Sequence, residues 1–218
     1  MKVLLALVTC WFLVGCVSKQ TPHSLSSQQA KAHARIALAV GYLKQGNFDK
    51  ARANIDKAVE HAPSYFHTQL TQAHYFELVG EVDKAKQLYQ DAIADHPNNG
   101  DVLNNYAAFL CKQQNYLQAD KYFNQAIAQP QYTHLADSYE NAGLCALKAQ
   151  QLSSATYYLE RALDYRPNSE KSLLQLTQIH LSQQSCFQAQ SLLTRYQQLY
   201  GATSSALALS DALASECH

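Results

Sequence analysis

The sequence predicts an all-α protein, a superhelix made of repeated helix pairs. Alanines and prolines return at one fixed interval of 34 residues through most of the 218-residue chain. Glycine, at 7 residues, and proline, at 5, are scarce, so the chain lacks the turn chemistry that a many-stranded sheet needs. Hydrophobic residues make up 47% of the chain, enough for a core. The recurring positions are Ala51, Ala85 and Ala119, then Ala58, Ala92 and Ala126, then Pro63 and Pro97.

The period continues toward the C-terminus with one interruption. Ala155 and Ala162 follow their predecessors by 36 residues, which places two extra residues near Pro130. The pattern resembles the tetratricopeptide repeat, a helix–turn–helix unit in which a large residue follows an alanine by four positions. Those large residues are Ile55, Tyr89, Phe123, Leu159 and Leu193. We expect five repeats over residues 31–201, then a capping helix and tail over residues 202–218.

The turn inside each repeat should reverse the chain through a left-handed residue. Gly46 and Gly80 occupy this position in the first two repeats, as is common where a helix ends. The later repeats have Gln114, Gln150 and Gln184 there instead. A side chain disfavours the left-handed conformation, so we expect these three turns to be less favourable.

The N-terminus has the features of an export signal. A lysine and a twelve-residue apolar run, too short for an ordinary membrane span, precede Gly15 and Cys16. This junction resembles the bacterial lipobox, whose cysteine is acylated. The alternative is a plain signal peptide that happens to end in a cysteine. We predict a signal peptide over residues 1–15 and a lipidated N-terminus and tether over residues 16–30. Ser18 is not the aspartate that retains such lipoproteins at the inner membrane, so we expect an outer-membrane anchor facing the periplasm.

Charge and motifs exclude several classes of function. Lys plus Arg and Asp plus Glu both number 17, which argues against nucleic acid as a partner. The sequence contains no phosphate-binding loop, dinucleotide fingerprint, serine-hydrolase elbow or zinc motif. We therefore expect no enzyme, no cofactor, no small-molecule substrate and no metal. His67 and His74 lie seven residues apart on one predicted helix, but two groove-lining polar residues explain them better than a metal site does.

The first helices of repeats three and four are expected to line a groove on the inner face of the superhelix. Asn105 and Asn141 occupy the same repeat position, and a side-chain amide offers both a donor and an acceptor to an extended peptide. The alternative is that these amides bond to a neighbouring repeat. With the charges balanced, we expect a groove without strong charge. The candidate lining residues are Asn104, Asn105, Ala108, Glu140, Asn141, Leu144 and Leu147.

Two short stretches carry a more specific resemblance. The segments 103–111 (LNNYAAFLC) and 140–149 (ENAGLCALKA) resemble the third- and fourth-repeat signatures of the type IV pilus biogenesis/stability lipoproteins, the PilF/PilW pilotins. That resemblance implies a non-enzymatic outer-membrane lipoprotein. It would bind pilus secretin subunits and promote their localisation and multimerisation. The alternative is a tetratricopeptide scaffold lipoprotein of another envelope-assembly complex, one for outer-membrane protein insertion or cell-wall synthesis.

The six cysteines divide by role. Cys10 lies in the signal segment and Cys16 at the lipidation position, which leaves four in an oxidising periplasm. Four cysteines allow three pairings. Repeat geometry favours one of them, since Cys111 and Cys145 fall near the ends of adjacent first helices. The capping helix would return Cys217 to Cys186. We therefore predict the disulfides Cys111–Cys145 and Cys186–Cys217.

Overall fold

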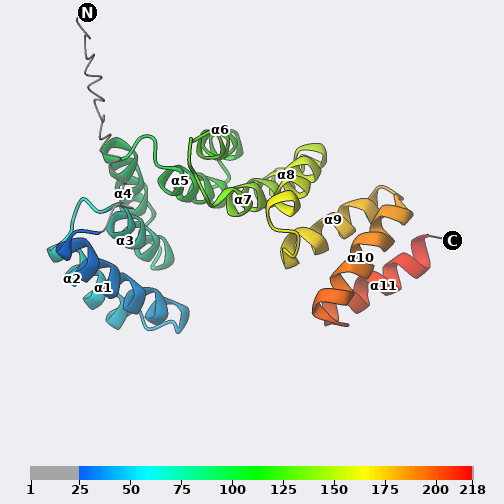
Figure 1. Ribbon diagram of the computed structural model, residues 1–218, viewed down its shortest axis with the longest axis horizontal. Helices are drawn as coiled ribbons and strands as arrows, with labels where there is room; N and C mark the ends of the chain where they lie inside the picture. The colour runs from blue at the N-terminus through cyan, green and yellow to red at the C-terminus, as the bar shows by residue number, and fades with distance from the viewer. Residues whose placement is uncertain (1–24, 218) are drawn as a thin grey trace, which may run out of the picture.

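The computed structural model describes residues 25–217, and the predicted signal segment and Cys16 lie outside them. The described residues form eleven α-helices and no strand, which follow one another in an arch (Figure 1). The predicted all-α superhelix of five helix pairs and a capping helix is confirmed. The helices are α1 (Ser27–Lys44), α2 (Phe48–His61), α3 (Phe66–Leu78), α4 (Val82–Asp95), α5 (Gly100–Lys112), α6 (Tyr116–Ile127), α7 (Leu135–Lys148), α8 (Leu152–Tyr165), α9 (Glu170–Ser182), α10 (Cys186–Tyr200) and α11 (Ser204–Glu216).

Each pair consists of an A helix (α1, α3, α5, α7 or α9) and the B helix that follows it. The first alanine of every B helix is completely buried, because it lies where the two helices cross and only a small side chain fits there. The large residue four positions on points from the same face, one turn along the helix, and is also buried. A larger side chain in place of the alanine would force the helices apart, at a cost of about 1–3 kcal/mol.

The A helices form the inner row of the superhelix. Helix α1 packs on α3, α3 on α5, and α5 on α7, while each B helix packs on the A helix of its own repeat and on that of the next. Helix α11 packs on both α9 and α10 and so covers the last pair. Helices α1, α3, α5 and α7 thus present a continuous surface on which side chains from neighbouring repeats meet.

The first helix begins earlier than composition predicted. Residues 27–30 were expected in the tether, but α1 starts at Ser27. The reason is a capping box: the Gln29 backbone N–H donates to the Ser26 hydroxyl (3.2 Å), and the Gln29 side chain accepts from the Ser26 N–H (3.0 Å). A polar stretch that reads as linker therefore supplies the start of a helix.

The turns inside the repeats are left-handed in all five cases. Gly46 and Gly80 have φ of 70° and 83°, and the three glutamines have φ of 61°, 59° and 56°. In each turn the N–H after the left-handed residue donates to a carbonyl five residues back, as from Ser185 to His180 (2.8 Å). The closing hydrogen bond is thus the same in all five turns, and it holds the glutamines in a conformation that suits glycine better.

None of the helices described is long and apolar enough to cross a membrane.

We expect Gln184→Gly to raise the free energy of unfolding by about 0.5–1 kcal/mol, because glycine adopts the left-handed conformation without steric cost. Urea denaturation at neutral pH measures the change. The control is Gln183→Gly, one residue earlier, where φ is −95°. There the added freedom of the unfolded chain should lower stability by about 0.5–1 kcal/mol. Equal effects of the two substitutions would contradict the turn analysis.

Candidate functional site

A small cavity of about 180 Å³ lies on the inner face, between the last turns of α5 and α7. Three predicted groove residues line it, namely Ala108 from α5 and Asn141 and Leu144 from α7. Its other lining residues are Cys111, Lys112, Phe123, Cys145 and Lys148. Both segments of the family resemblance therefore contribute to one concave site.

The side chains of the three predicted groove asparagines, Asn104, Asn105 and Asn141, form hydrogen bonds within or between helices α5 and α7. The Asn141 amide donates to the Asn104 side-chain oxygen (3.2 Å) and so joins α7 to α5. Asn104 is 8% exposed. The Asn105 amide donates to the carbonyl of Asp101 in its own helix (2.8 Å). The Asn141 amide thus makes a bond between repeats and also lines the cavity, whereas the Asn105 amide is bound within its own helix.

Glu140 and Leu147 do not line the cavity. The Glu140 carboxylate, only 9% exposed, accepts hydrogen bonds from the hydroxyls of Ser169 and Ser172 at the start of α9, with Lys171 3.7 Å away. It therefore fastens repeat four to repeat five. Leu147 packs against the main core. The helical register predicted both residues on the inner face. In the structure, however, both side chains make contacts between helices instead of facing the cavity.

Two lysines that were not predicted from the sequence lie on the rim of this cavity. Lys112 and Lys148 are the last residues of α5 and α7 and hold the same repeat position, 36 residues apart. The balanced composition predicted a groove without strong charge, but the rim of the cavity carries these two lysines. The recurrence of lysine at this position was the signal that could have found them.

The two lysines differ in their partners. The Lys112 ammonium lies 2.5 Å from the buried Glu77 carboxylate, which His74 also approaches at 3.6 Å. Burial alone would raise the pKa of Glu77, but the hydrogen bonds from His74 and Lys112 outweigh it and hold that pKa below its usual value. Lys148 has no ion-pair partner within the described part of the chain. Lys148 is thus the cation that remains available to a ligand.

The disulfide Cys111–Cys145 forms part of the cavity wall. Its Cα atoms are 5.8 Å apart, and both residues are buried. Gly143, two residues before Cys145, is required for close packing of α7 on α8. A Cβ at this position would lie 2.7 Å from the Leu159 side chain, so a larger residue would separate the two helices. The ENAGLC stretch therefore combines a helix contact and a covalent link at one site.

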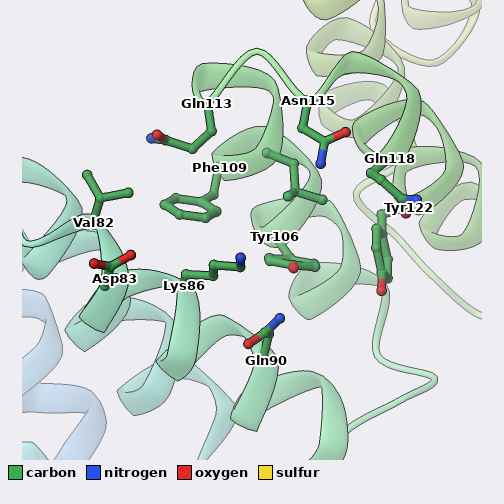
Figure 2. A pocket seen from close by; sticks show the side chains of 11 residues that line it. Val82, Asp83, Lys86, Gln90, Tyr106, Phe109, Gln113, Asn115, Gln118 and Tyr122 are labelled. Atoms are coloured by element: carbon green, nitrogen blue, oxygen red, sulfur yellow. The ribbon is translucent and has the colours of Figure 1, made fainter.

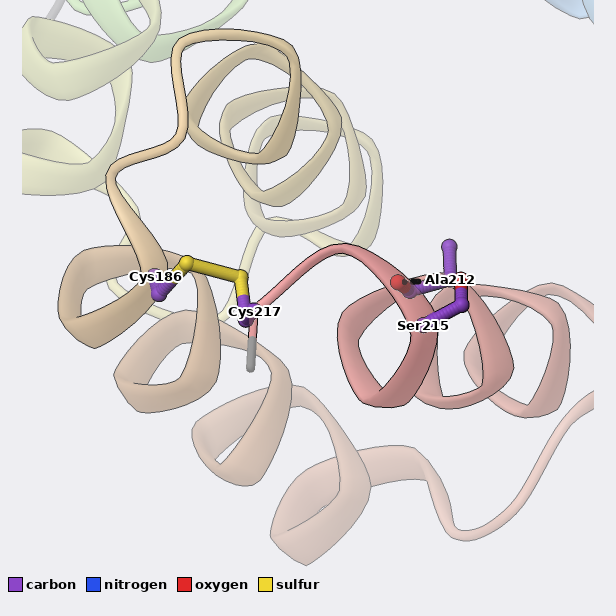
Figure 3. Close-up of a disulfide and its surroundings, with 4 residues drawn as sticks. All are labelled: Cys186, Ala212, Ser215 and Cys217. Carbon is purple, nitrogen blue, oxygen red and sulfur yellow. Dashed lines mark hydrogen bonds between the residues drawn. A yellow bond between two sulfur atoms is a disulfide. The ribbon is translucent and has the colours of Figure 1, made fainter.

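The second disulfide lies at the end of the arch. Cys186, in the first turn of α10, is joined to Cys217, the residue after α11 (Figure 3), with Cα atoms 5.7 Å apart. Both residues are partly exposed, unlike the first pair. This bond ties the C-terminal end of the capping helix to the fifth repeat.

The two histidines considered for a metal do not face a common point. His67 lies against the ring of His33, with centroids 6.2 Å apart, and burial lowers its pKa. His74 instead approaches Glu77. Within residues 25–217, no group of three potential metal ligands comes together.

Comparison with known sequences identifies the repeat and close relatives. Models of the tetratricopeptide repeat family match residues 32–65 and 100–168. An uncharacterised protein of Haemophilus influenzae is 38% identical over 160 residues, which are 73% of this chain and 88% of that protein. The type IV pilus assembly protein PilF of Pseudomonas aeruginosa is 30% identical over 170 residues, 77% of this chain and 68% of PilF.

Solved structures give the same picture. The structure of Pseudomonas aeruginosa PilF matches with a TM-score of 0.76 at 27% identity, covering 87% of this chain and 86% of that one. PilW, described as a widely conserved type IV pilus biogenesis factor, matches with a TM-score of 0.70 at 23% identity, covering 85% and 90%. At 23% identity, the similarity to PilW shows a shared fold.

Removing the inner disulfide by Cys111→Ala with Cys145→Ala should lower the free energy of unfolding by about 3–4 kcal/mol, because the bond closes a long loop in the unfolded chain. Urea denaturation measures this loss. Peptide mapping of the unreduced protein provides the control and should recover both linked pairs. Alkylation of all four cysteines in unreduced, denatured protein would contradict the pairing.

Proposed function

We propose that this chain, which belongs to the PilF/PilW family of tetratricopeptide-repeat proteins of type IV pilus biogenesis, acts as a pilotin. In this role it binds pilus secretin subunits and promotes their localisation and multimerisation at the outer membrane. The observation that carries the proposal is the 30% identity to PilF across 77% of the chain. The secretin as partner comes from the resemblance of segments 103–111 and 140–149 to the pilotin signatures.

The cavity between α5 and α7 suits a short segment of such a partner. Ala108 and Leu144 offer apolar contact, and the Asn141 amide offers hydrogen bonds to a peptide backbone. Lys148, at the rim, would attract a carboxylate on the segment. Because this charge is exposed and single, binding should weaken only modestly with added salt.

The lipid anchor completes the proposed mechanism. Acyl chains on Cys16 would hold the protein at the outer membrane, since two or more chains anchor firmly where one does not. The superhelix would then hold a secretin subunit while it travels to that membrane. Binding and delivery are thus assigned to different parts of the chain and can be tested separately.

Leu144→Asp should weaken secretin binding by about tenfold or more, because a carboxylate would enter the apolar part of the cavity. The measurement is the affinity of the purified chain for secretin subunits. Leu117→Asp is the matched control, because Leu117 lies on α6 and is 82% exposed. Circular dichroism confirms that both variants fold. Unchanged affinity of the Leu144→Asp variant would place the secretin site elsewhere. If the chain captured a different envelope-assembly complex instead of secretin, the scaffold alternative would be favoured.

Cys16→Ser should leave secretin binding intact but misplace the secretin multimers, since the variant carries no acyl chains. Membrane fractionation followed by detection of the multimers measures the effect. Normal amounts of multimer in the outer membrane of this variant would show that the anchor is not needed.

A further inference from the structure

We infer that a cleft between α4 and α6 is a second binding site, which takes a short extended segment of a polypeptide. The cleft has a volume of about 520 Å³ and lies on the B-helix side, away from the cavity between the ends of α5 and α7. Figure 2 shows its walls coming from α4 and α6 and its floor from α5. Its size falls within the range of ordinary ligand sites.

Two of the other junctions between B helices are bridged by side chains. Between α2 and α4, the Phe76 ring is flanked by Arg52 and Lys84, at 5.9 and 5.3 Å from its centroid. Between α6 and α8, the Tyr158 hydroxyl donates to the Asp120 carboxylate (2.7 Å) and accepts from Asn124 (2.9 Å). In both places an interaction spans the space between the helices.

The junction between α4 and α6 lacks such a bridge because its equivalent residues differ. Tyr122 corresponds to Tyr158, but the position of Asp120 is taken by Lys86, which cannot accept a hydrogen bond. Tyr122 packs instead edge-on against Tyr106, with centroids 4.9 Å apart. Within the described residues no side-chain hydrogen bond or ion pair links α4 to α6, and the space stays open (Figure 2).

The walls of the cleft carry two facing polar rows. Lys86 and Gln90 lie one turn apart on α4, and Gln118 and Tyr122 lie one turn apart on α6, with Asn115 before them. The α4 row covers about 6 Å and the α6 row, counted from Asn115, about 10 Å, which is the length of two to three residues of extended chain. Side-chain amides on both sides can bond the N–H and C=O groups that an extended peptide presents to its two edges.

The floor specifies the side chain that would enter. It consists of the nearly buried rings of Tyr106 and Phe109, and the partly exposed Tyr122 ring stands beside them on the wall, so an aromatic or long aliphatic side chain that enters would meet aromatic rings. Asp83 and Lys86 on one wall balance each other in charge, which favours an uncharged segment. Since this site does not share its lining with the inner cavity, the protein can hold two segments at once.

A labelled, end-capped pentapeptide Ser-Gln-Phe-Gln-Ser tests the site by fluorescence anisotropy with the purified chain. We expect a dissociation constant below about 1 mM, and about tenfold weaker binding when alanine replaces the central phenylalanine. Gln90→Ala with Gln118→Ala should also weaken binding about tenfold. The matched control, Gln87→Ala with Gln125→Ala, alters exposed glutamines of the same helices outside the cleft and should change nothing.

Lys86→Asp provides a second test, because it restores the arrangement found between α6 and α8. The new carboxylate would accept from the Tyr122 hydroxyl, so the variant should melt at a higher temperature and lose the peptide. A lack of peptide binding would overturn the inference, as would glutamine variants that bind the peptide as tightly as the parent chain. Leu144→Asp should leave peptide binding unchanged, which separates this site from the proposed secretin site.

Discussion

The close crossing of the two helices in each repeat is the constraint on which the rest of the structure depends. A fully buried alanine at the start of every B helix permits that approach, and the large residue one turn later fills the space beside it. The same contact recurs every 34 residues, or 36 at the third connection, and so builds the same helix pair in each repeat. The arch of helices in Figure 1 follows from this repetition.

The repetition also creates the surfaces that differ between repeats. Because the repeats share one backbone arrangement, residues at equivalent repeat positions have similar surroundings. The chemistry of their side chains then decides whether they bond to each other across the junction. Asp120 and Tyr158 close one junction, while Lys86 and Tyr122 leave the corresponding one open. Likewise Lys112 is bound by Glu77, while Lys148 has no such partner among residues 25–217.

The sequence predicts the helices far better than the side chains of the site. The helix pairs can be predicted from the alanine spacing, because the alanines mark where two helices of one repeat approach closely. That contact can be recognised without knowing which side chains the neighbouring repeats supply. The groove depends on contacts across repeats, and Glu140 shows the difference: its register is that of the inner face, but Ser169 and Ser172 engage it. Lys148 was missed for a related reason, because a balanced total charge hides a local cation.

The proposed function requires that the inner face between α5 and α7 receives the secretin. Photo-cross-linking tests it most directly, with a photoreactive residue in place of Lys148 on the rim of the cavity and, separately, in place of Lys121, exposed on α6. We predict secretin adducts from position 148 and few or none from position 121. Adducts from position 121 alone would contradict it.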